Sequence, residues 1–337
     1  MLNLIRKILF CFVLLCAAIH LAGQDAVYSQ FYLSPTLLNP AFAGNTHSPF
    51  VSVNYRNQWP GIDRAYSTYS VSYDQQWKDN SGVGIYVNSD NAGAGAIKTT
   101  KVAGIYAYKI RLNRETYLKG SIEAGYGQTS LDWQQLVFFD SLDPQFGATS
   151  PGGVTIPSSE VPSTNLSRSF FDIGTGVLIY NPLWYAGLSL KHANSPTVDF
   201  IDDQTGRRGQ LPSRFTLHGG MQISIEQGNR SSTGTFISPN ALISVQGDFW
   251  QVTAGAYVNV DQVFGGVWYR QGGANGDAVI GSIGVKSGIF KIGYSYDYTI
   301  SDLSIGSGGA HEIGVTMLFD MLEPKKFQYS DCLNLFR

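Results

Sequence analysis

Along most of the chain, segments of about ten residues alternate apolar or aromatic positions with polar or small ones, and turn-forming residues separate the segments. A period of two is the signal of β-strands whose two faces meet different environments. Between residues 252 and 260 one face carries Val252, Ala254, Ala256, Val258 and Val260, and the other carries Thr253, Gly255, Tyr257 and Asn259. The same alternation places Ile313, Val315, Met317 and Phe319 on one face of a strand near the C-terminus.

The pattern predicts fourteen strands, at residues 48–58, 66–76, 80–90, 98–112, 114–128, 168–180, 183–193, 212–226, 236–246, 248–260, 262–271, 276–287, 288–299 and 309–320. An even number of antiparallel strands of about 9–11 residues is typical of bacterial outer-membrane barrels. The sheet must close, because lipid leaves a free sheet edge unsatisfied. We therefore predict an all-β fold, a closed antiparallel transmembrane β-barrel over residues 48–320, in the outer membrane.

Residues 1–23 have the features of a secretory signal peptide. Arg6 and Lys7 precede an apolar run at residues 8–19, and the small residues Ala22 and Gly23 follow. Cleavage after Gly23 is expected, whereas lipoprotein processing at Cys16 is disfavoured by the bulky Leu15 before it. Cys332, in a predicted periplasmic tail at residues 321–337, is then the single cysteine of the mature chain, which excludes an intrachain disulfide.

Composition agrees with a barrel and excludes other classes. Charged residues are 14% of the chain, against about 25% in average soluble domains. The net charge of −2 and the lack of a basic block exclude nucleic acid as a partner. After the N-terminus, no apolar segment is long enough for a membrane-spanning helix. Outer-membrane lipids are expected around a girdle of aromatic residues: Tyr66, Tyr69, Tyr73, Trp77, Trp184, Tyr185, Trp268, Tyr269, Tyr294, Tyr296 and Tyr298.

Two connections, at residues 129–167 and 194–211, are much longer than the others, such as those at 78–80 and 112–114. Long irregular loops usually carry function or disorder, and in outer-membrane barrels they face the outside of the cell. These two loops are therefore the predicted sites of partner binding.

Residues 24–47 combine turn formers with apolar side chains, among them Tyr28, Phe31, Tyr32 and Phe42. The segment is too apolar for a free tail and too rich in proline for a long strand. Two interpretations stay open. It folds into the barrel lumen or caps its periplasmic mouth as a plug, or it is a periplasmic arm that becomes ordered on a partner.

This segment and residues 55–60 resemble the opening of the PorP/SprF family of type IX secretion system membrane proteins of Bacteroidetes. That opening begins with Gln-Asp-Pro and an aromatic-Ser-Gln-aromatic motif, followed by Asn-Pro-Ala-x-Ala-Gly and then Tyr-Arg-x-Gln-Trp. The matching residues are Asn39, Pro40, Ala41, Gly44, Tyr55, Arg56, Gln58 and Trp59. Ala26 replaces the family's usual proline, and residues 265–270, 293–297 and 311–314 are later echoes of the family pattern.

The resemblance implies an outer-membrane barrel that serves type IX secretion and, in some members, gliding motility. It implies other type IX components as partners, together with secreted cargo proteins whose C-terminal signal domains are exported or held at the surface. It brings no catalytic residues and no cofactors. For the motif at residues 39–44, a structural role in a tight turn and a partner-binding role both stay open. Arg56 is interpreted as a lumenal charge paired with an acid, and Trp59 as an interface anchor.

Two other functions are considered. One is an outer-membrane channel or transporter that passes small or hydrophobic solutes beside an N-terminal plug. The other is a barrel enzyme, which is disfavoured because the Gly-x-Ser-x-Gly and His-Glu-x-x-His patterns are missing. His47, His192, His218 and His311 also lack the spacing of metal ligands. We expect no catalytic activity, no metal and no cofactor.

Overall fold

The computed structural model describes residues 25–46, 48–62, 65–142, 154, 156–160, 166–198, 200, 209–225, 235–273, 275–301 and 305–319. The predicted signal peptide at residues 1–23 and the predicted tail at residues 321–337, with Cys332, lie outside the described residues. Much of the two long connections lies outside them as well.

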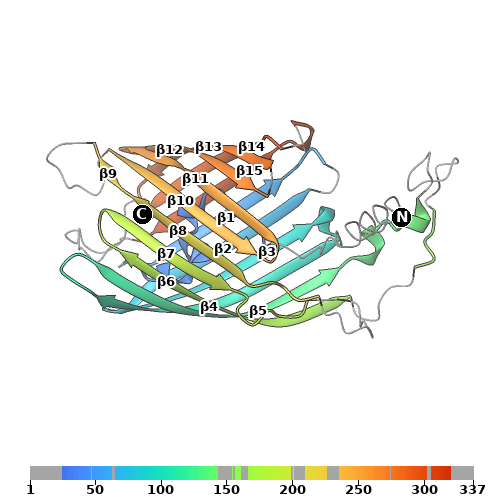
Figure 1. Cartoon of the computed structure of the whole chain (residues 1–337), viewed down its shortest axis with the longest axis horizontal. Helices are drawn as coiled ribbons and strands as arrows, with labels where there is room; N and C mark the ends of the chain where they lie inside the picture. The colour runs from blue at the N-terminus through green and yellow to red at the C-terminus, as the bar shows by residue number, and fades with distance from the viewer. Residues whose placement is uncertain are drawn as a thin grey trace, which may run out of the picture.

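The strands form one antiparallel sheet that closes on itself (Figure 1). The strands are β1 (Phe50–Gln58), β2 (Tyr66–Lys78), β3 (Ser81–Ala92), β4 (Ile97–Arg111), β5 (Tyr117–Leu131), β6 (Ser167–Tyr180), β7 (Trp184–Lys191), β8 (Arg214–Met221), β9 (Ile223–Ser224), β10 (Phe236–Gln246), β11 (Phe249–Val260), β12 (Val263–Gly272), β13 (Asn275–Ser287), β14 (Phe290–Thr299) and β15 (Ala310–Leu318). The last strand, β15, pairs with β1, and β8 and its short continuation β9 both pair with β10. The predicted closed 14-stranded barrel is confirmed.

Alternation along each strand separates a lipid-facing surface from the lumen. In β11, Val258 and Val260 are exposed, whereas Tyr257 and Asn259 are buried. In β1, Ser52, Asn54 and Arg56 are buried between more exposed neighbours. Successive side chains on a strand point to opposite faces, so every second position enters the barrel. The interior accordingly carries many polar side chains, as expected for a transmembrane barrel, together with a buried aromatic cluster that includes Tyr257 and Trp268.

Two residues of the predicted aromatic girdle point the other way. Tyr185 and Trp268 are each 2% exposed and lie in the lumen, whereas their neighbours Trp184 and Tyr269 face outward. The girdle prediction was wrong for these two, because adjacent strand residues cannot share a face.

Some predicted strand boundaries also need correction. Residues 114–116 belong to the turn before β5, because the side chain of Asn113 accepts hydrogen bonds from the backbone N–H groups of Glu115 (3.0 Å) and Thr116 (2.8 Å). The predicted strand at 212–226 is interrupted at Gln222, which separates β8 from β9.

The connections differ between the two ends of the barrel. The end from which the connections 132–166 and 192–213 leave is called the loop end below, and the opposite end, which contains residues 46–50 and 318, is called the turn end. In outer-membrane barrels the long loops face outward and the short turns face the periplasm, so the loop end is assigned to the outside.

The helices are all short: η1 (Phe31–Leu33), α2 (Pro35–Leu38), η2 (Pro40–Phe42), η3 (Gly93–Gly95), η4 (Trp133–Gln135), η5 (Phe139–Ser141) and η6 (Ile305–Ser307). In the described ranges, no helix has the length and apolarity needed to cross a membrane.

Candidate functional site

Residues 25–46, called the lumen segment below, lie inside the barrel. Residues 29–36 and 39–43 are buried. Asp25 contacts His192 and Arg214 at the loop end, whereas the N–H of Gly44 donates to Asp74 Oδ1 (2.7 Å) near the turn end. The lumen segment therefore runs the length of the lumen before the chain enters β1.

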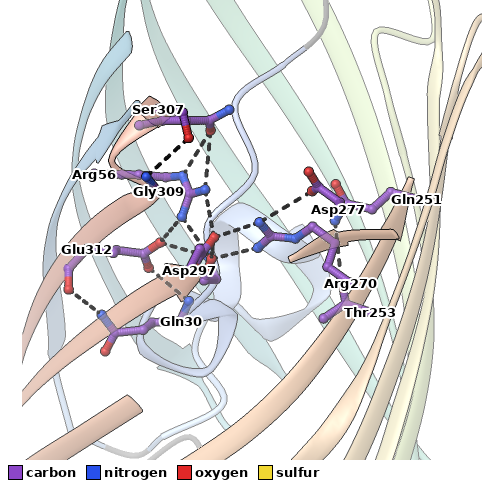
Figure 2. Close-up of polar contacts among 12 residues, drawn as sticks. Gln30, Arg56, Gln251, Thr253, Arg270, Asp277, Asp297, Ser307, Gly309 and Glu312 are labelled. Atoms are coloured by element: carbon purple, nitrogen blue, oxygen red, sulfur yellow. Dashed lines mark hydrogen bonds and ion pairs between the residues drawn. The ribbon is translucent and has the colours of Figure 1, made fainter. Parts of the chain in front are cut away.

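A buried cluster of two arginines and two carboxylates holds the first part of the lumen segment; we call Arg56, Arg270, Asp297 and Glu312 the arginine–carboxylate cluster. Figure 2 shows both arginines directed at Asp297. Arg56 Nη2 lies 2.9 Å and Arg270 Nη1 lies 2.7 Å from Asp297 Oδ2. Arg56 Nη1 also lies 3.2 Å from Glu312 Oε2. The four side chains are at most 5% exposed, so solvent screens these charges little.

The lumen segment adds hydrogen bonds to this cluster. The Ser29 hydroxyl accepts from Arg56 (2.8 Å) and Arg270 (2.6 Å) and donates to Asp297 (2.8 Å). The backbone N–H groups of Ser29 and Gln30 donate to the two oxygens of Glu312, at 2.7 and 2.9 Å. A buried carboxylate is tolerated when its acceptor sites are filled, so the segment and the cluster stabilise each other.

A second charged group, called the lysine–histidine network below, lies across the lumen and consists of Lys101, Glu123, Asp172, His192, Arg214 and Asp25. Lys101 bridges Glu123 (2.8 Å) and Asp172, and Asp172 contacts His192 Nδ1 (2.9 Å). His192 Nε2 and Arg214 Nη1 contact Asp25 Oδ2 at 2.8 and 3.1 Å.

The surroundings shift the pKa of both Asp25 and His192. Burial acts to raise the pKa of Asp25, but the charges of Arg214 and His192 outweigh it and lower this pKa. Burial acts to lower the pKa of His192, but the negative charge of Asp25 and the hydrogen bond to Asp172 raise it. Both groups are therefore favoured in their charged forms, which strengthens the contact between them.

Aromatic packing holds the middle of the lumen segment towards the turn end. The ring of Tyr32 stacks on Trp268, with centroids 5.5 Å apart, and lies 5.2 Å from Tyr257. Lys291 Nζ lies 5.0 Å from the centroid of Phe264 and 5.3 Å from that of Tyr257, in the range of cation–π attraction. This part of the segment is therefore held by packing as well as by hydrogen bonds.

The predicted motif at residues 39–44 forms the turn by which the lumen segment reaches β1. Asn39 Oδ1 accepts from the N–H of Ala41 (2.9 Å), and Pro40 occupies the first position of η2. Asn39 Nδ2 lies 3.1 Å from the carbonyl oxygen of Val177, 3.3 Å from that of Leu188 and 3.0 Å from His218 Nε2. One amide thus connects the turn to β6, β7 and β8.

Gly44 follows with φ of +64°, and a Cβ there would lie 2.5 Å from the Cα of Gly82. Both the left-handed backbone and the close approach require glycine.

The second predicted motif divides between two environments. Arg56 belongs to the arginine–carboxylate cluster, and Gln58 Oε1 accepts from Arg56 Nη2 (3.2 Å). Tyr55 lies on the outer face beside Tyr69, with centroids 4.8 Å apart. Trp59 leaves the strand with φ of +60°, and its ring lies 5.6 Å from that of Tyr66. The structure does not bring Tyr55 and Trp59 together with the lumen residues.

The other members of the arginine–carboxylate cluster were missed from the sequence. Arg270, Asp297 and Glu312 each lie within one of the three later echoes of the family pattern, at 265–270, 293–297 and 311–314. The sequence signal for these three residues was that each occupies an inward-facing position of its strand. Barrel closure determines which inward-facing side chains contact one another, and the alternation of residues along each strand does not predict these contacts.

Comparisons with solved structures find other barrels with low sequence identity. The Ralstonia pickettii toluene transporter TbuX is 10% identical, with 84% of this chain and 91% of that chain covered and a TM-score of 0.48. A Pseudomonas aeruginosa FadL homologue is 13% identical, with 83% and 93% covered and a TM-score of 0.43. The Acinetobacter baumannii outer membrane protein Omp33 is 11% identical, with 82% and 100% covered and a TM-score of 0.42. No curated protein matches the chain.

The sequence profile of one protein family matches nearly the whole chain. The match covers residues 20–317, which includes the lumen segment and every strand except the last residue of β15, and the family is described as type IX secretion system membrane protein PorP/SprF. The matched range contains the motifs at 39–44 and 55–59, which form the turn of the lumen segment and supply Arg56. The chain belongs to the PorP/SprF family of type IX secretion system membrane proteins, and its barrel is that of an outer-membrane protein.

Proposed function

We propose that this protein is a binding scaffold of the type IX secretion system, which helps to export or to hold at the surface secreted proteins that carry a C-terminal signal domain. The observation that supports this proposal is the filled lumen. The chain's own residues 25–46 run through the barrel, and hydrogen bonds to Asp297 and Glu312 together with the ion pairs of Asp25 hold them there. A barrel filled in this way offers partners its loops and rims.

The connection 132–166 at the loop end offers an ordered, strongly exposed aromatic side chain. In the connection 132–166, Trp133 packs on Phe138 with centroids 4.7 Å apart, and the next residue, Phe139, is 92% exposed. Asp140 accepts hydrogen bonds from the Ser158 hydroxyl (2.7 Å) and the Ser159 N–H (2.6 Å). These bonds hold the short helix η5, so Phe139 is displayed on a fixed support, as in the aromatic hot spots of protein interfaces.

The proposal assigns no catalytic step to the barrel. The barrel anchors and positions a partner protein. Whether it contributes to gliding motility depends on which secreted protein it holds. Other type IX components are expected at the same rim or at the turn end, where secreted proteins arrive from the periplasm.

The test is an affinity purification of the tagged protein from gently solubilised outer membranes of secreting cells, followed by mass spectrometry. We expect a large secreted protein with a C-terminal signal domain, and we expect Phe139→Ala to reduce its recovery several-fold. Tyr108→Ala is the matched control, because Tyr108 is an exposed aromatic on the lipid face of β4. Recovery of the barrel alone from secreting cells would contradict the proposal, and single-channel conductance would then test the transporter alternative.

A further inference from the structure

Asp25 and the connection 192–213 meet at the loop end. His192 directly follows β7 and Arg214 is the first residue of β8, so the two groups that hold the Asp25 carboxylate stand at the two ends of this connection. The Ser213 hydroxyl donates to the backbone carbonyl of His192 (2.8 Å) and ties these ends together. The barrel wall thus builds a site around one carboxylate, at the base of a long loop.

This site contacts backbone as well as side chain. Gln246 Oε1, from the loop end of β10, accepts a hydrogen bond from the backbone N–H of Asp25 (3.0 Å). A carboxylate and the N–H of the same residue are therefore bound together. That combination matches an aspartate within a polypeptide better than a phosphate group, which has no N–H to offer.

Around Asp25, the barrel wall carries more positive groups than negative ones, which favours binding of one carboxylate. The wall groups near Asp25 are Lys101, Lys191, His192 and Arg214 on the positive side, against Glu123, Asp172 and Asp90 on the negative side. Among the described residues Asp25 is the one acid in an ion pair with Arg214, and Arg214 Nε is buried without a hydrogen-bond partner there. If Asp25 leaves, a largely buried arginine loses its compensating charge, which is strongly unfavourable unless another carboxylate replaces it.

The tip of the lumen segment is held less firmly than the rest. Residues 25–28 are half-buried, whereas residues 29–36 are buried. Polar contacts hold this tip, residues 25–28, including the hydrogen bond from the Tyr28 hydroxyl to Asn88 (3.0 Å). The tip is therefore able to leave the wall while the arginine–carboxylate cluster and the aromatic packing still hold residues 29–46 in the lumen.

We propose that His192, Arg214 and Gln246 form a binding site for an aspartate-containing peptide segment, which Asp25 fills from within the chain and a partner protein fills in its place. Exchange of one aspartate for the other frees the tip and ties the partner to the base of the connection 192–213. This site goes beyond the proposed function. Because its test needs no secreted protein, a negative result for one proposal does not contradict the other.

The test measures binding of a fluorescent peptide with the sequence of residues 24–29 to the purified full-length barrel in detergent. We expect Asp25→Asn to bind this peptide about tenfold more tightly than the wild type, because competition by the chain's own carboxylate is weakened. Asp248→Asn is the matched control: Asp248 is an exposed carboxylate at the loop end, and this variant should bind as the wild type does. Adding Arg214→Gln to Asp25→Asn should abolish the gain.

Three results would overturn the proposal. Equal affinity of Asp25→Asn and the wild type would show that no such competition exists. Equal binding of a peptide with asparagine in place of aspartate would show that the carboxylate does not contribute to binding. Release of the peptide by inorganic phosphate at the peptide's own concentration would show a site for any oxyanion.

A second measurement does not depend on the folding of the Asp25 variant. In a Cys332→Ser background, Ala26→Cys places a thiol on the half-buried tip. Excess peptide should speed its reaction with a maleimide several-fold, while the asparagine peptide should leave the rate unchanged. A rate that the aspartate peptide does not alter would contradict the exchange.

Discussion

Arg56 and Glu312 are directly opposite each other where the last strand closes on the first. They are register partners in the β1–β15 pair, 256 residues apart in sequence, and Arg56 Nη1 lies 3.2 Å from Glu312 Oε2. Both also contact Ser29 of the lumen segment. The seam of the barrel and the position of the lumen segment are therefore fixed by the same buried charges.

Replacing Arg56 by glutamine should strongly destabilise the barrel. Glutamine leaves Glu312 and Asp297 without one of their buried positive partners, and breaking such pairs usually costs about 3–5 kcal/mol. The measurement is the free energy of unfolding in detergent micelles with increasing denaturant. Arg114→Gln is the control, since Arg114 is exposed in the turn before β5. If both variants unfold at the same denaturant concentration, the cluster does not stabilise the seam.

Asn39→Ala should loosen the turn of the lumen segment. The variant removes the bond to the Ala41 N–H and the Nδ2 contacts to β6, β7 and β8. Loss of the cap alone usually costs about 0.5–2 kcal/mol, and buried carbonyls without partners add to it. We expect faster proteolysis within residues 25–46 of the folded barrel.

The control for Asn39 is Asn181→Ala, which removes two side-chain-to-backbone bonds, from the N–H groups of Leu183 and Trp184, in an exposed turn. Proteolysis at the same rate in both variants would mean that Asn39 does not hold the segment.

The contact between Asp25 and His192 should make stability depend on pH at both ends of the range. The folded-state pKa of His192 is raised, so its contribution is complete below the unfolded value of about 6.5 and is lost as pH rises through the folded value. The folded-state pKa of Asp25 is lowered, so its contribution is present above the unfolded value of about 3.9 and is lost as pH falls through the folded one.

The stability difference between the wild type and His192→Gln should therefore be largest between about pH 4 and 6.5 and should narrow at higher pH. Unfolding midpoints of both proteins, measured across pH 4–10, check this. A difference that stays constant as pH rises would show that the charge of His192 contributes nothing.

Alternation along the strands was enough to predict the barrel, because a strand that faces lipid on one side must carry an apolar residue at every second position. It was not enough to orient pairs such as Trp184 and Tyr185, since both residues are suited to a girdle and a shift of one residue exchanges their faces. Turn chemistry decided the start of β5, where Asn113 caps the turn.

The site was predicted less completely than the fold. Arg56 and the residues of the 39–44 motif were identified, but their partners were not. Asp297 meets Arg56 only because β14, β15 and β1 are neighbours after closure, and Asp25 meets His192 only because the lumen segment runs to the loop end. Contacts of such long sequence separation leave no local pattern.

Gly44→Ala should destabilise the protein more than the same change at Gly288. Both glycines have positive φ, +64° and +58°, so both variants bear the left-handed penalty, which is about 1–2 kcal/mol. At Gly288 a Cβ meets nothing within 4 Å, whereas at Gly44 it would lie 2.5 Å from the Cα of Gly82 and 2.7 Å from the carbonyl oxygen of Gln75. Both contacts are backbone, so the turn or β3 must move, which also strains the bond from the Gly44 N–H to Asp74. Denaturant unfolding should therefore separate the two variants, and equal losses would mean that the turn adapts to a Cβ without displacing β3.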